Sequence, residues 1–145
     1  MGKTKQAMGK AARRKGHDFE REVAKRFREA MPGAEVCRGQ QARDGGDAPD
    51  VSPPCFWVEV KHRNKLNERA ALEQAMNTAP IGRTPVAICK KTRQKPNATI
   101  MFCDLYDLVD PSSNGAGGDP DDIVVTLALD EFFNIVAKWW KRVNQ

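Results

Sequence analysis

The stretch that decides the fold lies at residues 49–61 and reads PDVSPPCFWVEVK. Its second half alternates and is rich in aromatic and β-branched side chains, which predicts a strand over residues 55–61. The Ser-Pro-Pro run before that strand predicts a turn, and the residues ahead of the turn read as a strand or a strand end. A turn at this point can fold the first segment back against the second. It would bring Asp50, Glu59 and Lys61 together.

The predicted strand separates its apolar and charged side chains by alternation. Because successive side chains point to opposite faces, Phe56, Val58 and Val60 share one face, while Glu59 and Lys61 project side by side from the other. One interpretation is a surface ion pair on a half-exposed strand. The other is an acidic centre, since Asp50 would be folded against the same strand.

A helix is predicted upstream, because apolar residues recur at helical spacing from Phe19 to Met31 and a Pro-Gly pair follows. At 100° per residue these residues cover an arc of about 140°, and Glu20 falls inside it while the other charged residues fall outside. A carboxylate on a buried face is costly unless it is paired or bound to a cation. The alternative is a glutamate tolerated at the start of the helix by the helix dipole and solvent.

The remaining pattern predicts one α/β domain over residues 16–145, preceded by a flexible basic arm over residues 1–15. Helices interleaved with strands indicate a mixed sheet with helices packed on it. The predicted elements are a helix at 19–31, strands at 36–37, 49–51 and 55–61, a helix at 66–79, strands at 85–90 and 98–103, a short helix at 104–109, a strand at 123–129, and a last helix capped by Asp130 that ends near Val143.

Composition excludes several classes of protein. No apolar run approaches the ~18 residues that a membrane-spanning helix needs, and no apolar segment follows the basic N-terminus as in a secretory signal. The chain has 4 cysteines without a C-x-x-C pair and only 2 histidines, so a zinc framework is not expected. We therefore expect a cytoplasmic protein without a membrane partner, whose cysteines are free thiols in the core.

Charge is distributed unevenly around the formal net value of +5. Residues 1–43 and 61–95 each carry a surplus of +7, whereas residues 44–60 carry −4 and residues 104–131 carry −8. Two basic blocks thus flank a short acidic centre. Basic blocks attract polyanions, of which nucleic acid is the common one, although a solvated surface gives the same pattern.

The motif Pro49-Asp50, eight residues, then Glu59-Val60-Lys61 resembles the motif of PD-(D/E)xK nucleases. The upstream run KGHDFERE at residues 15–22 resembles the opening helix of archaeal-type Holliday junction resolvases and their phage relatives, in which a helix glutamate completes the metal site. Glu20 matches that glutamate. The resemblance covers roughly residues 15–103 and implies a restriction-endonuclease-like fold, a mixed β-sheet flanked by helices with an α-β-β-β-α-β core.

The resemblance also implies an assignment of site residues. Phosphodiester hydrolysis is expected to use Mg²⁺, with Mn²⁺ as a substitute, because hard cations prefer oxygen ligands. The implied metal ligands are Glu20, Asp50, Glu59 and the Val60 carbonyl; the implied catalytic residues are Glu20, Asp50, Glu59 and Lys61. Lys61 would orient the attacking water or stabilise charge on the phosphate. The expected DNA-binding residues are Lys15, Arg38, Arg43, His62, Arg63 and Lys65, and His17 and Gln74 are further residues that could reach the site.

The expected activity is a structure-selective endonuclease that resolves DNA junctions as a homodimer, in the host cytoplasm if the chain is phage-encoded. One alternative is a general or nicking DNA endonuclease with the same site. Another is a non-catalytic basic DNA-binding module whose carboxylates form ion pairs. The aromatic residues of the last helix, Phe132, Phe133, Trp139 and Trp140, predict either packing over the sheet edge or a dimer contact.

Overall fold

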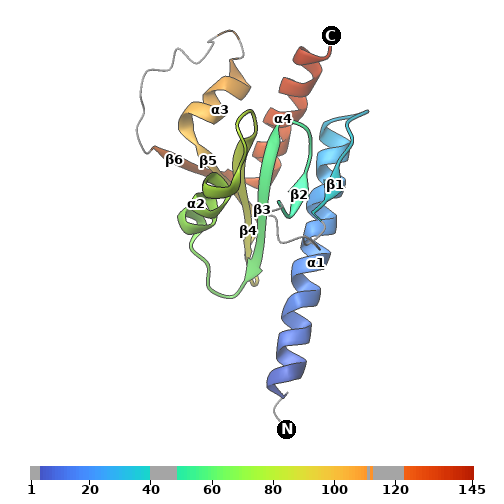
Figure 1. Ribbon diagram of the computed structural model, residues 1–145, viewed down its shortest axis with the longest axis vertical. Coiled ribbons are helices and arrows are strands. Elements are labelled where there is room, and N and C mark those ends of the chain that lie inside the picture. The colour runs from blue at the N-terminus through green and yellow to red at the C-terminus, as the bar shows by residue number, and fades with distance from the viewer. Residues whose placement is uncertain (1–3, 40–48, 111, 113–122) are drawn as a thin grey trace.

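The computed structural model describes residues 4–39, 49–110, 112 and 123–145. Within these residues the protein forms a six-stranded sheet with four helices around it (Figure 1). The elements in chain order are α1 (Lys5–Ala30), β1 (Cys37–Arg38), β2 (Val51–Ser52), β3 (Phe56–Arg63), α2 (Glu68–Thr78), β4 (Thr84–Lys91), β5 (Asn97–Met101), α3 (Phe102–Val109), β6 (Val124–Ala128) and α4 (Leu129–Val143). The α-β-β-β-α-β core order predicted from the sequence is confirmed.

The sheet is mixed, and its strands follow chain order from β1 to β6. β3 and β4 run parallel in a register that pairs Phe56 with Thr84 and Arg63 with Lys91, and α2 is the crossover between them. The other neighbouring strand pairs are antiparallel. The C-terminal end of β3 therefore lies beside the C-terminal end of β4, with the start of α2 following directly after β3 in the chain.

Two apolar layers hold the helices to the sheet. The larger cluster joins α1 and α4 to one face, with Phe27 of α1 and Phe132 of α4 packed against Phe56 of β3. The smaller cluster packs Leu72 of α2 against the opposite face, where Cys89 of β4 is buried. The alternation predicted for the strand at 55–61 is confirmed, because Phe56, Val58 and Val60 all belong to the larger cluster.

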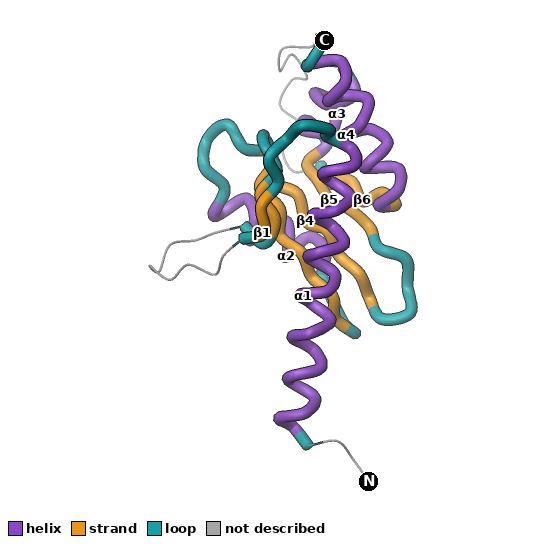
Figure 2. Tube along the Cα trace, turned by 90° about the vertical axis from the view of Figure 1, so that its right-hand side faces the viewer, coloured by secondary structure: helices purple, strands orange, loops and turns teal. Residues whose placement is uncertain are grey.

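Helix α1 begins far earlier than the apolar pattern indicates. Its N-cap is Thr4, whose side chain accepts a hydrogen bond from the Ala7 backbone N–H at 3.2 Å, and the helix runs for 26 residues. Residues 5–15, which we expected within a flexible arm, are instead helical and exposed. Alanine, lysine, arginine and glutamine favour helix strongly, and the packed part of α1 removes the cost of nucleation. These N-terminal turns project beyond the sheet (Figures 1 and 2).

The last helix begins two residues earlier than predicted, at Leu129, which changes the role of Asp130. The N-cap position is Ala128 and no side chain caps the helix, so the prediction that Asp130 caps it is wrong. Asp130 lies in the first turn and its Oδ1 is 2.7 Å from Nη2 of Arg26 on α1. A carboxylate in the first turn is also favoured by the helix dipole.

The aromatic residues of α4 pack within the chain. Phe132 and Phe133 are buried in the larger cluster, and the Trp139 ring packs edge-on against Phe56 at 5.6 Å. Trp140 Nε1 donates a hydrogen bond to the Pro32 carbonyl at 3.1 Å, across 108 positions of sequence. Packing over the sheet is therefore the role that the structure supports for these residues.

All four cysteines lie in the described residues and are free thiols. The prediction that they are core residues is confirmed for Cys89, which is buried, whereas Cys103 is half-buried. It is wrong for Cys37 and Cys55, which are exposed because one lies in a two-residue strand and the other in a turn with a φ of 70°. None of the helices in the described residues has the length and apolar character to cross a membrane.

Candidate active site

The turn between β2 and β3 brings Asp50 beside Glu59, as the sequence predicts. Val51 of β2 pairs with Val58 of β3, and the Asp50 backbone N–H donates to the Val58 carbonyl at 2.9 Å. The Asp50 side chain bends toward the same strand, where its Oδ2 accepts a hydrogen bond from the Val60 backbone N–H at 2.8 Å. Backbone pairing therefore fixes the Asp50 carboxylate against β3.

Glu59 is one of the few polar residues buried in the described chain, with 5% of its surface exposed. The pKa of Glu59 is raised from 4.5 to about 7, chiefly by burial and next by the charge and hydrogen bond of Asp50, with a smaller contribution from Glu20. The Lys61 ammonium opposes this shift from 3.9 Å. Glu20, Asp50 and Glu59 thus act on one another, and they concentrate negative charge at one point of the sheet.

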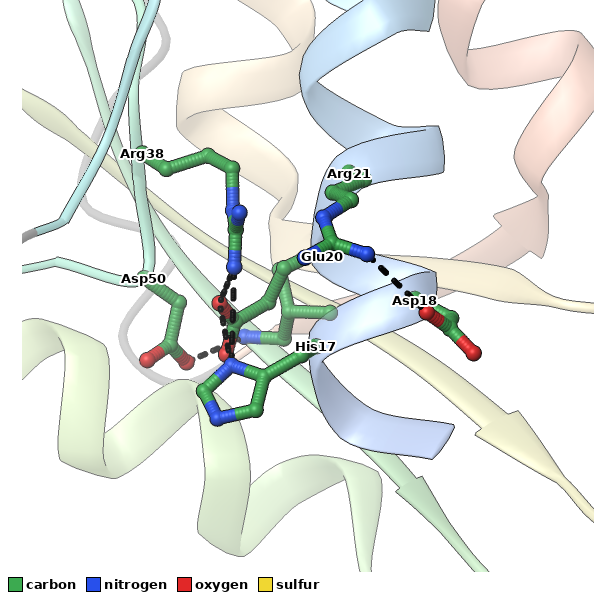
Figure 3. A network of polar contacts seen from close by, with 7 residues as sticks. His17, Asp18, Glu20, Arg21, Arg38 and Asp50 are labelled. Atoms are coloured by element: carbon green, nitrogen blue, oxygen red, sulfur yellow. Dashed lines mark hydrogen bonds and ion pairs between the residues drawn. The ribbon is translucent and has the colours of Figure 1, made fainter. Parts of the chain in front are cut away.

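Glu20 faces this point from α1, across from β3. Its Oε2 lies 3.4 Å from Nη2 of Arg38 on β1 and 3.7 Å from Nδ1 of His17, one turn earlier on α1 (Figure 3). The alternative of a glutamate at the helix start is wrong, because α1 begins at Lys5 and places Glu20 in its interior. Glu20, the charged residue that falls inside the apolar arc of the predicted helix, is therefore paired and turned toward the site.

A cavity of about 340 Å³ opens at this centre. It is lined by Glu20 of α1, by Val60 and Lys61 of β3, and by Asp50, which directly precedes β2. Its remaining lining residues are mostly cationic or imidazole side chains and small residues of α1: Arg13, Gly16, His17, Ala12, His62 and Arg63. The cavity thus combines carboxylates with basic side chains, which suits the binding of a cation together with an anionic group.

A second cavity of about 280 Å³ continues from the first on the α2 side. Lys61 and Arg63 line both cavities, and Lys65 and Gln74 line the second. Gln74 thus lines the cavity beside the acidic centre and not the cavity at the centre itself. Three cations and the amides of Asn67 and Gln74 around this cavity favour an anion such as a phosphate group next to the acidic centre.

The other expected DNA-binding residues lie in different surroundings. His62 and Arg63 line the first cavity, whereas Lys15 lies on the exposed part of α1 and lines a third cavity instead. Arg38 is half-buried and turned toward Glu20 rather than toward solvent. Arg43 lies outside the described residues.

Arg13 is the lining residue that sequence reasoning missed as part of the site. It belongs to the segment that we took for a flexible arm, so it had no fixed position relative to Asp50. The signal that could have placed it is the run of helix-forming residues from Lys5 to Lys15, interrupted only by Gly9, which leads into the predicted helix.

The donor atoms at the acidic centre decide which kind of metal ion could bind there. Among the described residues, His, Cys, Asp and Glu side chains form no group of three or more that is arranged to hold a metal ion. The donors near the centre are nevertheless hard oxygens, namely three carboxylates and the Val60 carbonyl, which fit Mg²⁺ in kind. Burial and the neighbouring Asp50 raise the pKa of Glu59, and a divalent cation would favour its ionised form.

Comparison with known proteins adds a fold-level likeness. No protein-family model and no curated protein matches the chain. Among solved structures, the chain resembles Hjc of Archaeoglobus fulgidus, a Holliday junction resolvase from an archaeal hyperthermophile. The two are 15% identical, with a TM-score of 0.45 over 84% of this chain and 98% of that chain. The residues of the site, rather than this likeness, carry the proposal that follows.

Proposed function

We propose that the chain is a Mg²⁺-dependent endonuclease that hydrolyses DNA phosphodiester bonds. The observation that carries the proposal is the meeting of Glu20, Asp50 and Lys61 in one cavity, with Glu59 buried beside them. Carboxylates held together at this cost, next to a lysine and other basic side chains, are suited to a cation and a phosphate. A module that only binds DNA has no need of a buried acidic centre on its basic face.

Each residue has a distinct part in this proposal. Asp50, Glu59, Glu20 and the Val60 carbonyl would hold Mg²⁺, which, when bound, acidifies a water molecule and neutralises charge on the scissile phosphate. Asp50 is already oriented by its hydrogen bond from Val60. The Lys61 Nζ, now 3.9 Å from Glu59, would donate to the attacking water or to a phosphate oxygen.

The basic residues around the cavity would position the DNA backbone. Arg13 and Arg63 line the first cavity, and Lys65 extends the positive charge toward α2. Contacts of this kind fix the register of a strand without reading its bases. Arg38 could join them if DNA or metal binding released it from Glu20.

The finer part of the proposal is a preference for four-way junctions and action as a homodimer. The sequence motifs at residues 15–22 and 49–61 support it through their resemblance to junction resolvases. A junction presents two symmetric strands, and a twofold dimer would place two identical sites on them. A general or nicking endonuclease with the same residues remains the alternative, because one chain contains the complete set.

A cleavage assay on two substrates tests the proposal. The full chain is incubated with a labelled four-way junction and with a linear duplex of equal length, in Mg²⁺, in Mn²⁺ and in EDTA. We expect cutting of the junction with either metal, none in EDTA, and slower cutting of the duplex. Equal rates on both substrates would favour the general endonuclease, whereas binding without cutting under every condition would favour the non-catalytic module.

A further inference from the structure

A third cavity, of about 380 Å³, lies on the other side of the acidic centre. It is formed between the projecting N-terminal turns of α1 and the end of β3, two segments that are far apart in the chain. Nothing in the proposed hydrolysis uses it. The third cavity nevertheless adjoins the first, because Ala12, His62 and Arg63 line both of them.

Arg63 is the residue that connects the whole surface. It lines the first cavity, at the acidic centre, which we call the acidic cavity. It also lines the second cavity, beside α2, which we call the cationic cavity, and this third cavity. A strand whose phosphate occupied the acidic centre would therefore have a neighbouring phosphate near Lys65 on one side. On the other side, the next nucleotide would lie at the mouth of the third cavity.

The walls of the third cavity differ in chemistry from those of the cationic one. Three of the four α1 residues in its wall, Met8, Ala11 and Ala12, are apolar, the fourth being Lys15, and Met8 keeps 59% of its surface exposed. The opposite wall includes the His62 ring, which is held edge-on against Phe19 at 5.7 Å. Apolar side chains on α1 together with a fixed ring provide contacts for a flat apolar group, which the second cavity with its three cations does not offer.

Polar groups lie at the same cavity. Asn64 and Thr92 both line it and are hydrogen-bonded to each other through their side chains. Lys15 and Arg63 add positive charge. Apolar walls with hydrogen-bonding groups and nearby cations are the features that proteins use to bind an unpaired nucleobase together with its phosphate.

We propose that this cavity receives one unstacked nucleobase of the DNA strand whose backbone lies in the active site. The inference rests on the proposed endonuclease function and specifies its substrate class, which is DNA with an unpaired nucleotide next to the scissile bond. A base in a continuous duplex must first be unpaired and unstacked, and this cost falls when the nucleotide is already unpaired at a branch or a flap.

The test measures binding, so it does not depend on cleavage. The full chain is titrated in EDTA with branched DNA that carries a short unpaired segment at the branch. Each unpaired nucleotide is replaced in turn by an abasic one. We expect one position, or two adjacent ones, at which loss of the base weakens binding by about 5-fold or more.

Variants of α1 assign the effect to the cavity. Ala11→Leu fills it from an exposed helical position and should abolish the difference between base and abasic DNA, and Met8→Ala, which removes part of the wall, should reduce it. The matched control is Ala7→Leu, because Ala7 is exposed on the same helix and is not among the residues that line the three cavities. Circular dichroism verifies that each variant keeps its helix.

The inference is overturned if no abasic position weakens binding of the unaltered chain, or if Ala11→Leu and Met8→Ala both retain the full effect. The two proposals fail separately. Cleavage without a base effect would refute the base site alone. A base effect without metal-dependent cleavage would refute the endonuclease and leave the base site as part of a DNA-binding module.

Discussion

The buried carboxyl group of Glu59 makes the stability of the protein depend on pH. Its pKa is about 7 in the folded protein and 4.5 ordinarily, so between these values the folded state holds a proton that the unfolded state has lost. Stability contributed by this group therefore falls as pH rises through that window. We expect thermal unfolding to show a loss of about 1–3 kcal/mol between pH 5 and pH 8 that Glu59→Gln lacks.

Added Mg²⁺ should restore the stability of the unaltered chain at pH 8, and it should restore less in Glu59→Gln, because the amide leaves one fewer anionic donor. The same loss with pH in both proteins would show that Glu59 does not hold the proton.

Variants of Lys61 and Lys65 distinguish a loss of catalysis from a loss of DNA binding. Lys61 lies 3.9 Å from Glu59 in the acidic centre, whereas Lys65 lines only the cationic cavity. Lys61→Met should lower the single-turnover cleavage rate by about 100-fold or more with little change in DNA affinity. Lys65→Met should weaken binding and leave the saturated rate nearly unchanged. Equal losses of rate in the two variants would contradict the role of Lys61.

The meeting of Asp50 with Glu59 could be predicted from the sequence, because a Ser-Pro-Pro turn and strict alternation fix which side chains of a hairpin face each other. The contact of Arg38 with Glu20 could not be predicted in the same way. It depends on the pairing of Cys37 with Ser52, which places β1 beside β2 after a long connection and so sets where Arg38 points. No local pattern in the sequence encodes that register.

At the scale of elements, the projecting part of α1 is the clearest target. Residues 2–14 carry 5 of the 24 basic residues, and the first buried residue of α1 is Phe19, so their deletion should leave the core folded. We expect weaker DNA binding and a slope of log affinity against log salt that is shallower by at least about 1. An unchanged slope would show that these turns do not contact DNA.

The sequence predicts well those elements whose apolar residues recur at a regular spacing, including β3 and α2. The sequence does not predict the start of α1, because Met8 is the only large apolar residue of Lys5–Lys15 and none of these residues is buried; the helix there follows from residue propensity, the Thr4 cap and continuity with a packed helix. Asp130 was misassigned because a helix start is hard to place within one or two residues when no side chain caps it.

At the scale of the whole molecule, we expect the protein to form a homodimer. The aromatic residues of α4 pack against the core of their own chain. The proposed dimer therefore rests on the symmetry of a junction and on the resemblance of the sequence motifs. Light scattering should give about twice the chain mass of 16.2 kDa near neutral pH. A monomer that still cuts junctions would contradict the dimer and leave the site in each chain unaffected.

The central claim is that one acidic centre between β2, β3 and α1 performs DNA hydrolysis, and a paired comparison of two aspartates tests it most directly. Asp50→Asn alters the acidic centre. Asp18→Asn instead alters an exposed carboxylate of α1 that pairs with Arg21 of the same helix (Figure 3). Single-turnover cleavage of a four-way junction in Mg²⁺ is measured for both variants and the unaltered chain. We predict that Asp50→Asn loses cleavage while Asp18→Asn cuts at the unaltered rate. Cleavage by Asp50→Asn near the unaltered rate would contradict the claim.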